Sequence, residues 1–96
     1  MDLTTLSRTA FESAIKRRKT RIGWSPAETA KSIQAEVKEL SKARPFEPSP
    51  HISRYTEVEE ELADILICCL TELYARGCNV QQVLEAKIAY NAIRED

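Results

Sequence analysis

The chain has 96 residues, of which 43% are apolar and 30% are charged, and its formal net charge is −1. This composition is typical of a globular protein and excludes a disordered or fibrous chain. A domain of this size buries little more than about 60% of the surface of its unfolded chain. We therefore expect residues 1–96 to form one domain that is stabilised by association into a homodimer or a homotetramer.

Charge is distributed unevenly along the chain. Residues 1–44 contain ten Lys or Arg against five Asp or Glu, whereas residues 45–96 contain four against ten. Five of the cations lie in the run 16–21, which is either a rim that attracts anions or a solvated helix end. Because this run has no interleaved aromatic residues, we do not expect stable nucleic-acid binding.

The cysteines and the apolar segments indicate where the protein resides. Cys68, Cys69 and Cys78 have no C-x-x-C spacing and are too few for a disulfide framework. The longest apolar stretch, residues 65–70, is too short to cross a bilayer, and the polar N-terminus lacks the apolar segment of a signal peptide. We expect a soluble, cytoplasmic protein with reduced thiols and no membrane association.

The apolar periodicity predicts four helices, of which two precede the proline-rich loop. The first carries an apolar stripe that begins at Leu3, and we expect it to end near Gly23. The second is introduced by Ser25, a capping residue, and by Pro26, which suits the first helical position. It stops before Pro45.

The segment 45–50 is predicted to be a loop. Its three prolines remove backbone donors and disfavour helix at the residues before them. The third helix opens at Ser53 or Thr56, the latter forming a capping box, and it runs to Arg76. Gly77 then provides a left-handed stop.

The fourth helix begins after Asn79 and continues to about Ile93. No segment has the pattern of a strand. The expected class is therefore all-α, a four-helix, bundle-like domain with its active site between antiparallel helices and completed by oligomerisation.

Two pairs of carboxylates lie three residues apart on successive helices, Glu36 with Glu39 and Glu61 with Asp64. Residues at this spacing project from the same side of a helix. Such pairs are common on solvated faces, but Asp64 is the only polar residue in the run 62–70, which predicts a buried helix. Burying an unpaired carboxylate costs several kcal/mol, and no Lys or Arg lies near Asp64 on this helix. A bound cation would satisfy it.

The acids that precede this pair, Glu57, Glu59 and Glu60, are explained by the dipole at the N-terminus of a helix, whereas Asp64 is not. Two antiparallel helices that each present a carboxylate pair inward form an all-oxygen site. Such a site suits Mg²⁺, with Mn²⁺ as a substitute, rather than Zn²⁺. Because Mg²⁺ completes its coordination with water and phosphate oxygens, the expected substrate carries phosphates.

Two further groups of residues are candidates for substrate binding. On the last helix, Lys87 and Asn91 lie one turn apart and Arg94 follows on the same face. These residues either hold phosphate or sugar oxygens or balance the acidic third helix. Trp24, the only tryptophan, either packs against the second helix or stacks on a nucleobase.

Taken together, these motifs resemble the MazG-like branch of the all-α nucleoside triphosphate pyrophosphohydrolases. The resemblance extends over residues 24–94 and is carried by Trp24-Ser25-Pro26, Lys31, Glu36-x-x-Glu39, Glu61-x-x-Asp64, Gly77, Lys87-x-x-x-Asn91 and Arg94. It implies a dimeric or tetrameric enzyme that uses Mg²⁺ to cleave a (d)NTP between the α and β phosphates. The products are the (d)NMP and pyrophosphate, and the role is house-cleaning of nucleotide pools.

The resemblance also implies roles for individual residues. It makes metal ligands of both carboxylate pairs, with Glu36 or Glu39 activating the attacking water. It assigns substrate contacts to Lys87, Asn91, Trp24 and Arg94. Cys68 stands where some relatives have an aromatic residue, which leaves base recognition open. The alternatives are a phosphoribosyl-ATP pyrophosphohydrolase or a dUTPase of the same superfamily, or a non-catalytic helical interaction module.

Overall fold

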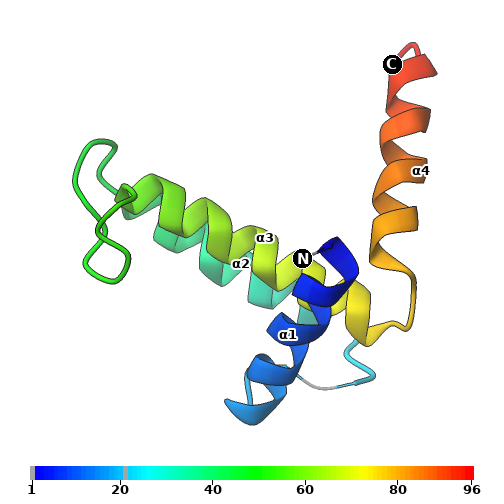
Figure 1. The fold of residues 1–96 in the computed structure, drawn as a ribbon, viewed down its shortest axis with the longest axis horizontal. Coiled ribbons are helices and arrows are strands. Elements are labelled where there is room, and N and C mark those ends of the chain that lie inside the picture. The colour runs from blue at the N-terminus through cyan, green and yellow to red at the C-terminus, as the bar shows by residue number, and fades with distance from the viewer. Residues whose placement is uncertain (1, 21) are drawn as a thin grey trace. The chain divides into compact units, whose positions relative to one another are not determined.

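The computed structural model describes residues 2–20 and 22–96, and within these residues it contains four helices and no strand. The helices are α1 (Leu3–Lys16), α2 (Pro26–Lys42), α3 (Glu57–Ala75) and α4 (Val80–Ile93) (Figure 1). The predicted all-α class is confirmed. None of the four helices combines the length and the apolar character needed to traverse a bilayer.

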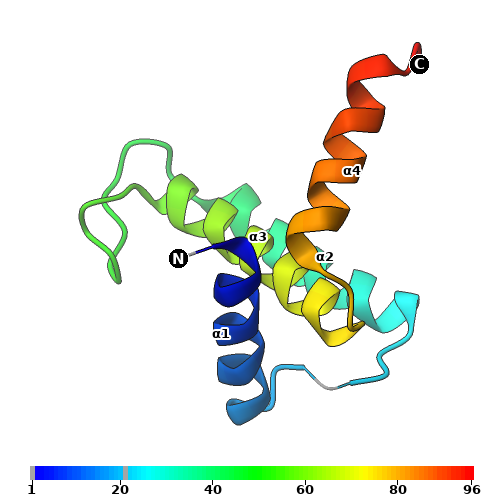
Figure 2. The same ribbon diagram turned by 45° about the vertical axis from the view of Figure 1, so that its right-hand side comes forward.

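The chain folds as two compact units. The first unit consists of residues 1–23 and 70–96 and holds α1, the end of α3 and α4. The second consists of residues 24–69 and holds α2 and the N-terminal part of α3. We call this second unit the hairpin, because its two helices run side by side in opposite directions and are joined at one end by a loop (Figures 1 and 2).

The predicted caps explain why α2 and α4 begin where they do. The Ser25 hydroxyl accepts a hydrogen bond of 3.2 Å from the Glu28 amide, and Pro26 occupies the first turn of α2. The Asn79 side chain accepts a bond of 3.0 Å from the Gln82 amide at the start of α4. Each cap satisfies one of the backbone donors that a helix leaves without an internal partner.

The ends of α3 are also defined by local chemistry. Thr56 and Glu59 form a complete capping box, in which the Thr56 amide donates to the Glu59 carboxylate at 2.9 Å and the Glu59 amide donates to the Thr56 hydroxyl at 3.2 Å. Of the two starts that the sequence allows, the one at Thr56 is therefore correct. At the other end Gly77 has φ of +80°, the left-handed conformation that was predicted to stop the helix.

The first helix is shorter than predicted, because α1 ends well before Gly23. The Arg18 amide bonds to the Ile15 carbonyl at 3.0 Å, and the Lys19 amide bonds to the Ala14 carbonyl at 2.8 Å. This is the pattern of a Schellman turn, with Arg18 at φ +58° in the position that glycine usually takes. The last apolar residue of the α1 stripe, Ile15, accepts one of these two bonds, so the helix ends where its apolar pattern ends.

The first unit contains the only buried apolar side chains in the part of the chain that the structure describes, namely Ala14, Leu70 and Val80. In the same unit the rings of Phe11 and Tyr74 lie 5.2 Å apart at a tilt of 45°, a favourable geometry for an aromatic pair. These contacts join α1 to the C-terminal part of α3. Of the predicted apolar stripe of α1, Ala14 is buried and Phe11 pairs with Tyr74, whereas Leu6 and Ile15 are exposed.

In the hairpin, by contrast, the apolar run of α3 is not buried as predicted. Leu62 is 52% exposed and Leu66 is 57% exposed, while Asp64 between them is half-buried. The physical reason is that only α2 lies beside this part of α3 within the hairpin, and one neighbouring helix covers only one side. The sequence predicts the apolar character of this run of α3 correctly, but not the number of helices that pack against it.

Candidate metal centre

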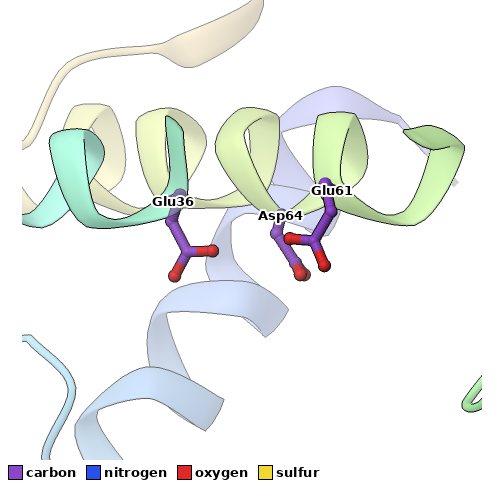
Figure 3. Close-up of side chains that lie close together, drawn as sticks. All are labelled: Glu36, Glu61 and Asp64. Carbon is purple, nitrogen blue, oxygen red and sulfur yellow. The ribbon is translucent and has the colours of Figure 1, made fainter. Parts of the chain in front are cut away.

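Three of the four predicted carboxylate ligands come together in the hairpin. Glu36 projects from α2, and Glu61 and Asp64 project from successive turns of α3, so that all three carboxylates lie on the same side of the helix pair (Figure 3). One carboxylate oxygen of each residue lies within 4.8 Å of the corresponding oxygens of the other two. All three residues are half-buried.

This spacing is close to what a small divalent cation requires. Mg²⁺ binds oxygen at about 2.1 Å in an octahedron, so two of its ligands lie about 3.0 Å apart when adjacent and about 4.2 Å apart when opposite. The three oxygens lie within 4.8 Å of one another, so side-chain rotations that draw them closer would let all three bind one cation. Three protein ligands leave positions for water or phosphate oxygens.

Glu39, the fourth predicted ligand, does not belong to this group. It lies one turn after Glu36 on α2 and is exposed. Its charge nevertheless acts at the site, because it is one of the four neighbouring carboxylates that raise the pKa of Glu61. Glu39 therefore lies near Glu36, Glu61 and Asp64, but its carboxylate is not among those that lie within 4.8 Å of one another.

Electrostatics set Glu61 apart from the other glutamates at the start of α3. Partial burial is the largest cause that raises its pKa above the usual value, and the nearby Asp64 adds to it, followed by Glu60, Glu36 and Glu39. Within residues 2–20 and 22–96, neither Glu36 nor Glu61 forms a hydrogen bond or an ion pair. Carboxylates gathered in this way repel one another unless a cation is shared between them, and perturbed groups of this kind concentrate at functional sites.

Glu57 and Glu59, which precede Glu61 on α3, bond to groups of the protein. The sequence predicts that these acids serve the N-terminus of the helix, but it does not predict the partner of Glu57. The Glu57 carboxylate accepts bonds of 3.0 Å from both the Arg44 amide and Nε, and one of 2.8 Å from Nη2. The backbone bond, followed by the side-chain bonds, lowers the pKa of Glu57. The capping bonds from Thr56 likewise lower the pKa of Glu59. These residues serve the helix end.

Glu60 is held by the loop between α2 and α3, an arrangement that the sequence did not reveal. The buried Ser49 hydroxyl donates to one Glu60 oxygen, and His51 Nδ1 lies 2.9 Å from the other. The Ser49 bond first, and the His51 bond second, lower the pKa of Glu60. The Ser49 hydroxyl also accepts bonds of 3.1 Å from the amides of His51 and Ile52. The pairing of Ser49 with Glu60 crosses the loop, so no local spacing indicates it.

The predicted substrate ligands on α4 belong to the first unit rather than to the hairpin. Lys87 lies over the ring of Tyr90, 4.7 Å from its centre, and Asn91 is exposed. Arg94 follows the last helical residue in an extended conformation, with Nε 3.8 Å from a carboxylate oxygen of Asp96. All of these side chains are open to solvent.

Trp24 and Cys68, the residues tied to base recognition in the sequence, belong to the hairpin. Trp24 is half-buried immediately before the cap of α2. The Cys68 sulfur lies 3.4 Å from the Ser32 hydroxyl, which links α3 to α2 one turn beyond Asp64. Cys68 therefore takes part in the packing of the two helices that carry the three carboxylates.

No protein-family model, curated protein or solved structure matches this chain. The candidate site is therefore defined by its own geometry: three carboxylates on two antiparallel helices, of which two have no protein partner among the described residues.

Proposed function

We propose that the protein is a Mg²⁺-dependent nucleoside triphosphate pyrophosphohydrolase that converts a (d)NTP to the (d)NMP and pyrophosphate. The observation that carries the proposal is the meeting of Glu36, Glu61 and Asp64 within 4.8 Å. Three oxygen ligands without a thiolate or imidazole suit a hard cation, and Mg²⁺ in proteins is commonly shared between carboxylates and substrate phosphates.

The reaction itself is inferred from the resemblance of residues 24–94 to the MazG-like pyrophosphohydrolases, and the described site is compatible with it. Bound there, Mg²⁺ would neutralise charge on the triphosphate and lower the pKa of a coordinated water. The Cys68 thiol on α3 lies 3.4 Å from the Ser32 hydroxyl, and the proposal assigns neither group a part in the chemistry. The reaction we propose is direct attack by a water that the metal activates.

In the proposed mechanism the carboxylates and the substrate-binding residues have separate roles. Glu36, Glu61 and Asp64 would hold the metal, and Glu36 or Glu39, which follows Glu36 by three residues on α2, would accept a proton from the attacking water. Lys87, Asn91 and Arg94 carry donors for phosphate or sugar oxygens, and Trp24 carries the ring for the base. Cytoplasmic house-cleaning of nucleotide pools remains the proposed role.

The test is a panel of canonical and modified nucleotides, including dUTP and phosphoribosyl-ATP, incubated with Mg²⁺ and analysed by product mass. We expect a monophosphate and pyrophosphate in equal amounts, and no product in EDTA. Asp64→Asn should lower the rate by at least about 100-fold, which corresponds to about 2.7 kcal/mol of transition-state stabilisation.

Glu59→Gln is the matched control, because Glu59 lies on the same helix and glutamine still forms a capping box. It should keep the wild-type rate. The hydrolase proposal is wrong if no nucleotide in the panel releases pyrophosphate with Mg²⁺ or Mn²⁺. The assignment of the metal ligands is wrong if the Asp64 and Glu59 variants are equally active.

A further inference from the structure

A dense group of cations lies where α1 ends. Four consecutive residues there are positively charged, and each is exposed: Lys16, Arg17, Arg18 and Lys19. We call them the basic turn. Within residues 2–20 and 22–96, none of the four takes part in an ion pair or a cation–π contact. Glu12, the one acid within α1, lies 3.9 Å from Arg8. No described acid of the chain therefore neutralises the basic turn.

The needs of the helix do not explain these charges. Cations are favourable near the C-terminus of a helix, but this effect fades beyond the last turn, and α1 ends at Lys16. Arg18 and Lys19 lie outside the helix, beside like charges that repel them. Arg18 also has φ of +58°, a conformation in which glycine avoids the steric cost of a Cβ atom. An arginine at this position therefore costs stability, and strained residues of this kind concentrate at functional sites.

The backbone of the basic turn is fixed to the unit that contains it. The Lys19 amide donates to the carbonyl of the buried Ala14 at 2.8 Å. The next residue, Thr20, is buried too, and its hydroxyl donates a bond of 2.6 Å to the buried carboxylate of Glu72 on α3. A turn that is already ordered loses little backbone freedom on binding. The four cations can therefore act together on one ligand.

The arrangement of the cations favours a flat ligand over a linear one. Successive residues of a helix point about 100° apart, so consecutive cations at a helix end spread around the axis rather than along one side. A strand of nucleic acid presents its phosphates along a line, whereas a lipid surface presents them in a plane. Ile15 and Ile22, which flank the basic turn in the sequence, are 40% and 71% exposed. Aliphatic side chains enter the headgroup region of a bilayer, whereas nucleobases are bound by stacking on aromatic rings.

We propose that the basic turn binds the surface of an anionic bilayer, with its four cations against the negatively charged lipid headgroups. Each Lys or Arg near such a surface strengthens binding about five-fold, so four of them strengthen it roughly 600-fold over a neutral bilayer. This attachment is peripheral and does not require the membrane-crossing helix that the described residues lack. It differs from the sequence-based expectation of no membrane association, and it depends neither on the metal site nor on the proposed reaction.

The first test is co-sedimentation of the full chain with lipid vesicles. One set of vesicles contains phosphatidylcholine alone, and the other also contains about 30% phosphatidylserine, which supplies the negative surface potential. In about 0.1 M salt we expect binding to the anionic vesicles to be stronger by about 100-fold or more. Raising the salt to about 1 M shortens the screening length to about 3 Å and should release most of the bound protein.

Arg18→Gly is the most informative variant, because it removes a charge without harming the turn. The loss of one cation should weaken binding to the anionic vesicles about five-fold. Glycine accepts the left-handed conformation, so the melting temperature should not fall, and unfolding cannot account for the weaker binding.

Arg54→Gln is the matched control. Arg54 is also exposed and forms no ion pair among the described residues, and its replacement changes the net charge by the same amount. Because Arg54 lies outside the basic turn, this variant should bind the anionic vesicles as the wild type does.

Three results would overturn the proposal. The first is equal binding of the wild type to vesicles with and without phosphatidylserine, including no binding to either. The second is an equal loss of binding in Arg18→Gly and Arg54→Gln, which would mean that only the net charge matters. The third is tighter binding to a single-stranded RNA of mixed sequence than to the anionic vesicles, at the same salt and phosphate concentrations. That result would make a nucleic acid the partner of the basic turn.

Discussion

Two adjacent sets of acids in the hairpin differ in how their charge is balanced. Glu57, Glu59 and Glu60 each bond to protein groups, and these bonds lower their pKa values. Glu61, the next residue, has a raised pKa caused by partial burial and by neighbouring carboxylates. One residue along a helix turns the side chain by about 100°, from the loop that supplies donors to the helix that supplies Glu36. Position on the helix, rather than local acidity, separates structural acids from candidate ligands.

The largest expected effect is on metal-linked stability. In Mg²⁺ at 100 times its dissociation constant, the wild type should gain about 2.7 kcal/mol of stability, seen as a rise in melting temperature. Glu61→Gln should lose this gain, yet be more stable than the wild type without metal, because one of the repelling charges is removed. Thermal denaturation with and without Mg²⁺ at constant ionic strength measures both. If Mg²⁺ raises the melting temperature of the wild type and of Glu61→Gln equally, Glu61 does not bind the metal.

A smaller effect is expected from the cap of α3. Thr56→Ala removes the hydroxyl that accepts the Glu59 amide and should cost about 1 kcal/mol in the free energy of unfolding. The rise in melting temperature caused by Mg²⁺ should be unchanged, because Thr56 does not belong to the carboxylate group. Urea denaturation measures the first quantity and a metal titration the second. Loss of the Mg²⁺ response would show that the helix end and the site are not independent.

The two sets of acids should respond to acidification with opposite signs. For Glu57, Glu59 and Glu60 the folded pKa lies below the usual 4.5, so their stabilisation is present above 4.5 and is lost as pH falls through the folded pKa. For Glu61 the folded pKa lies above 4.5, so its destabilising charge is neutralised as pH falls through that value. The stability advantage of Glu61→Gln without metal should therefore shrink between pH 7 and pH 4.5. Melting curves that show a constant advantage contradict this.

The smallest effect is expected from the exposed pair of Arg44 and Glu57. Arg44→Gln removes the bonds from Nε and Nη2 but leaves the backbone bond to Glu57, so the melting temperature should fall by no more than a few degrees. Because the pair is exposed to solvent, the difference should narrow in 1 M salt. Differential scanning calorimetry at two salt concentrations measures the difference in melting temperature between Arg44→Gln and the wild type. A salt-independent loss would mean that Arg44 acts through packing rather than through charge.

The features that were predictable from the sequence are local. The caps at Ser25, Thr56 and Asn79 and the stop at Gly77 depend on residues within one turn, and the structure contains all four. The spacing of three residues likewise placed Glu61 and Asp64 on one side of α3. Where geometry is set by the next few residues, the amino-acid pattern is sufficient.

The features that were not predictable depend on distant parts of the chain. The Ser49 hydroxyl donates a hydrogen bond to Glu60 across the loop, and no sequence pattern near either residue predicts this pair. The exposure of Leu62 and Leu66 depends on how many helices surround α3. An apolar run in the sequence does not predict that number. The end of α1 was misplaced because the left-handed turn at Arg18 lacks the usual glycine.

The loop between α2 and α3 has a consequence for the register of the two helices. The Ser49 amide bonds to the Tyr55 carbonyl at 2.8 Å, and the Glu57 amide bonds to the Glu47 carbonyl at 2.9 Å, so the loop is closed by its own backbone before α3 begins. Most surface loops accept an inserted residue at little cost. Here a slip of α2 by one position would move Glu36 about 1.5 Å along the helix and turn it by about 100°, away from Asp64. The backbone bonds of this proline-rich loop thereby help to set the register in which Glu36 meets Glu61 and Asp64.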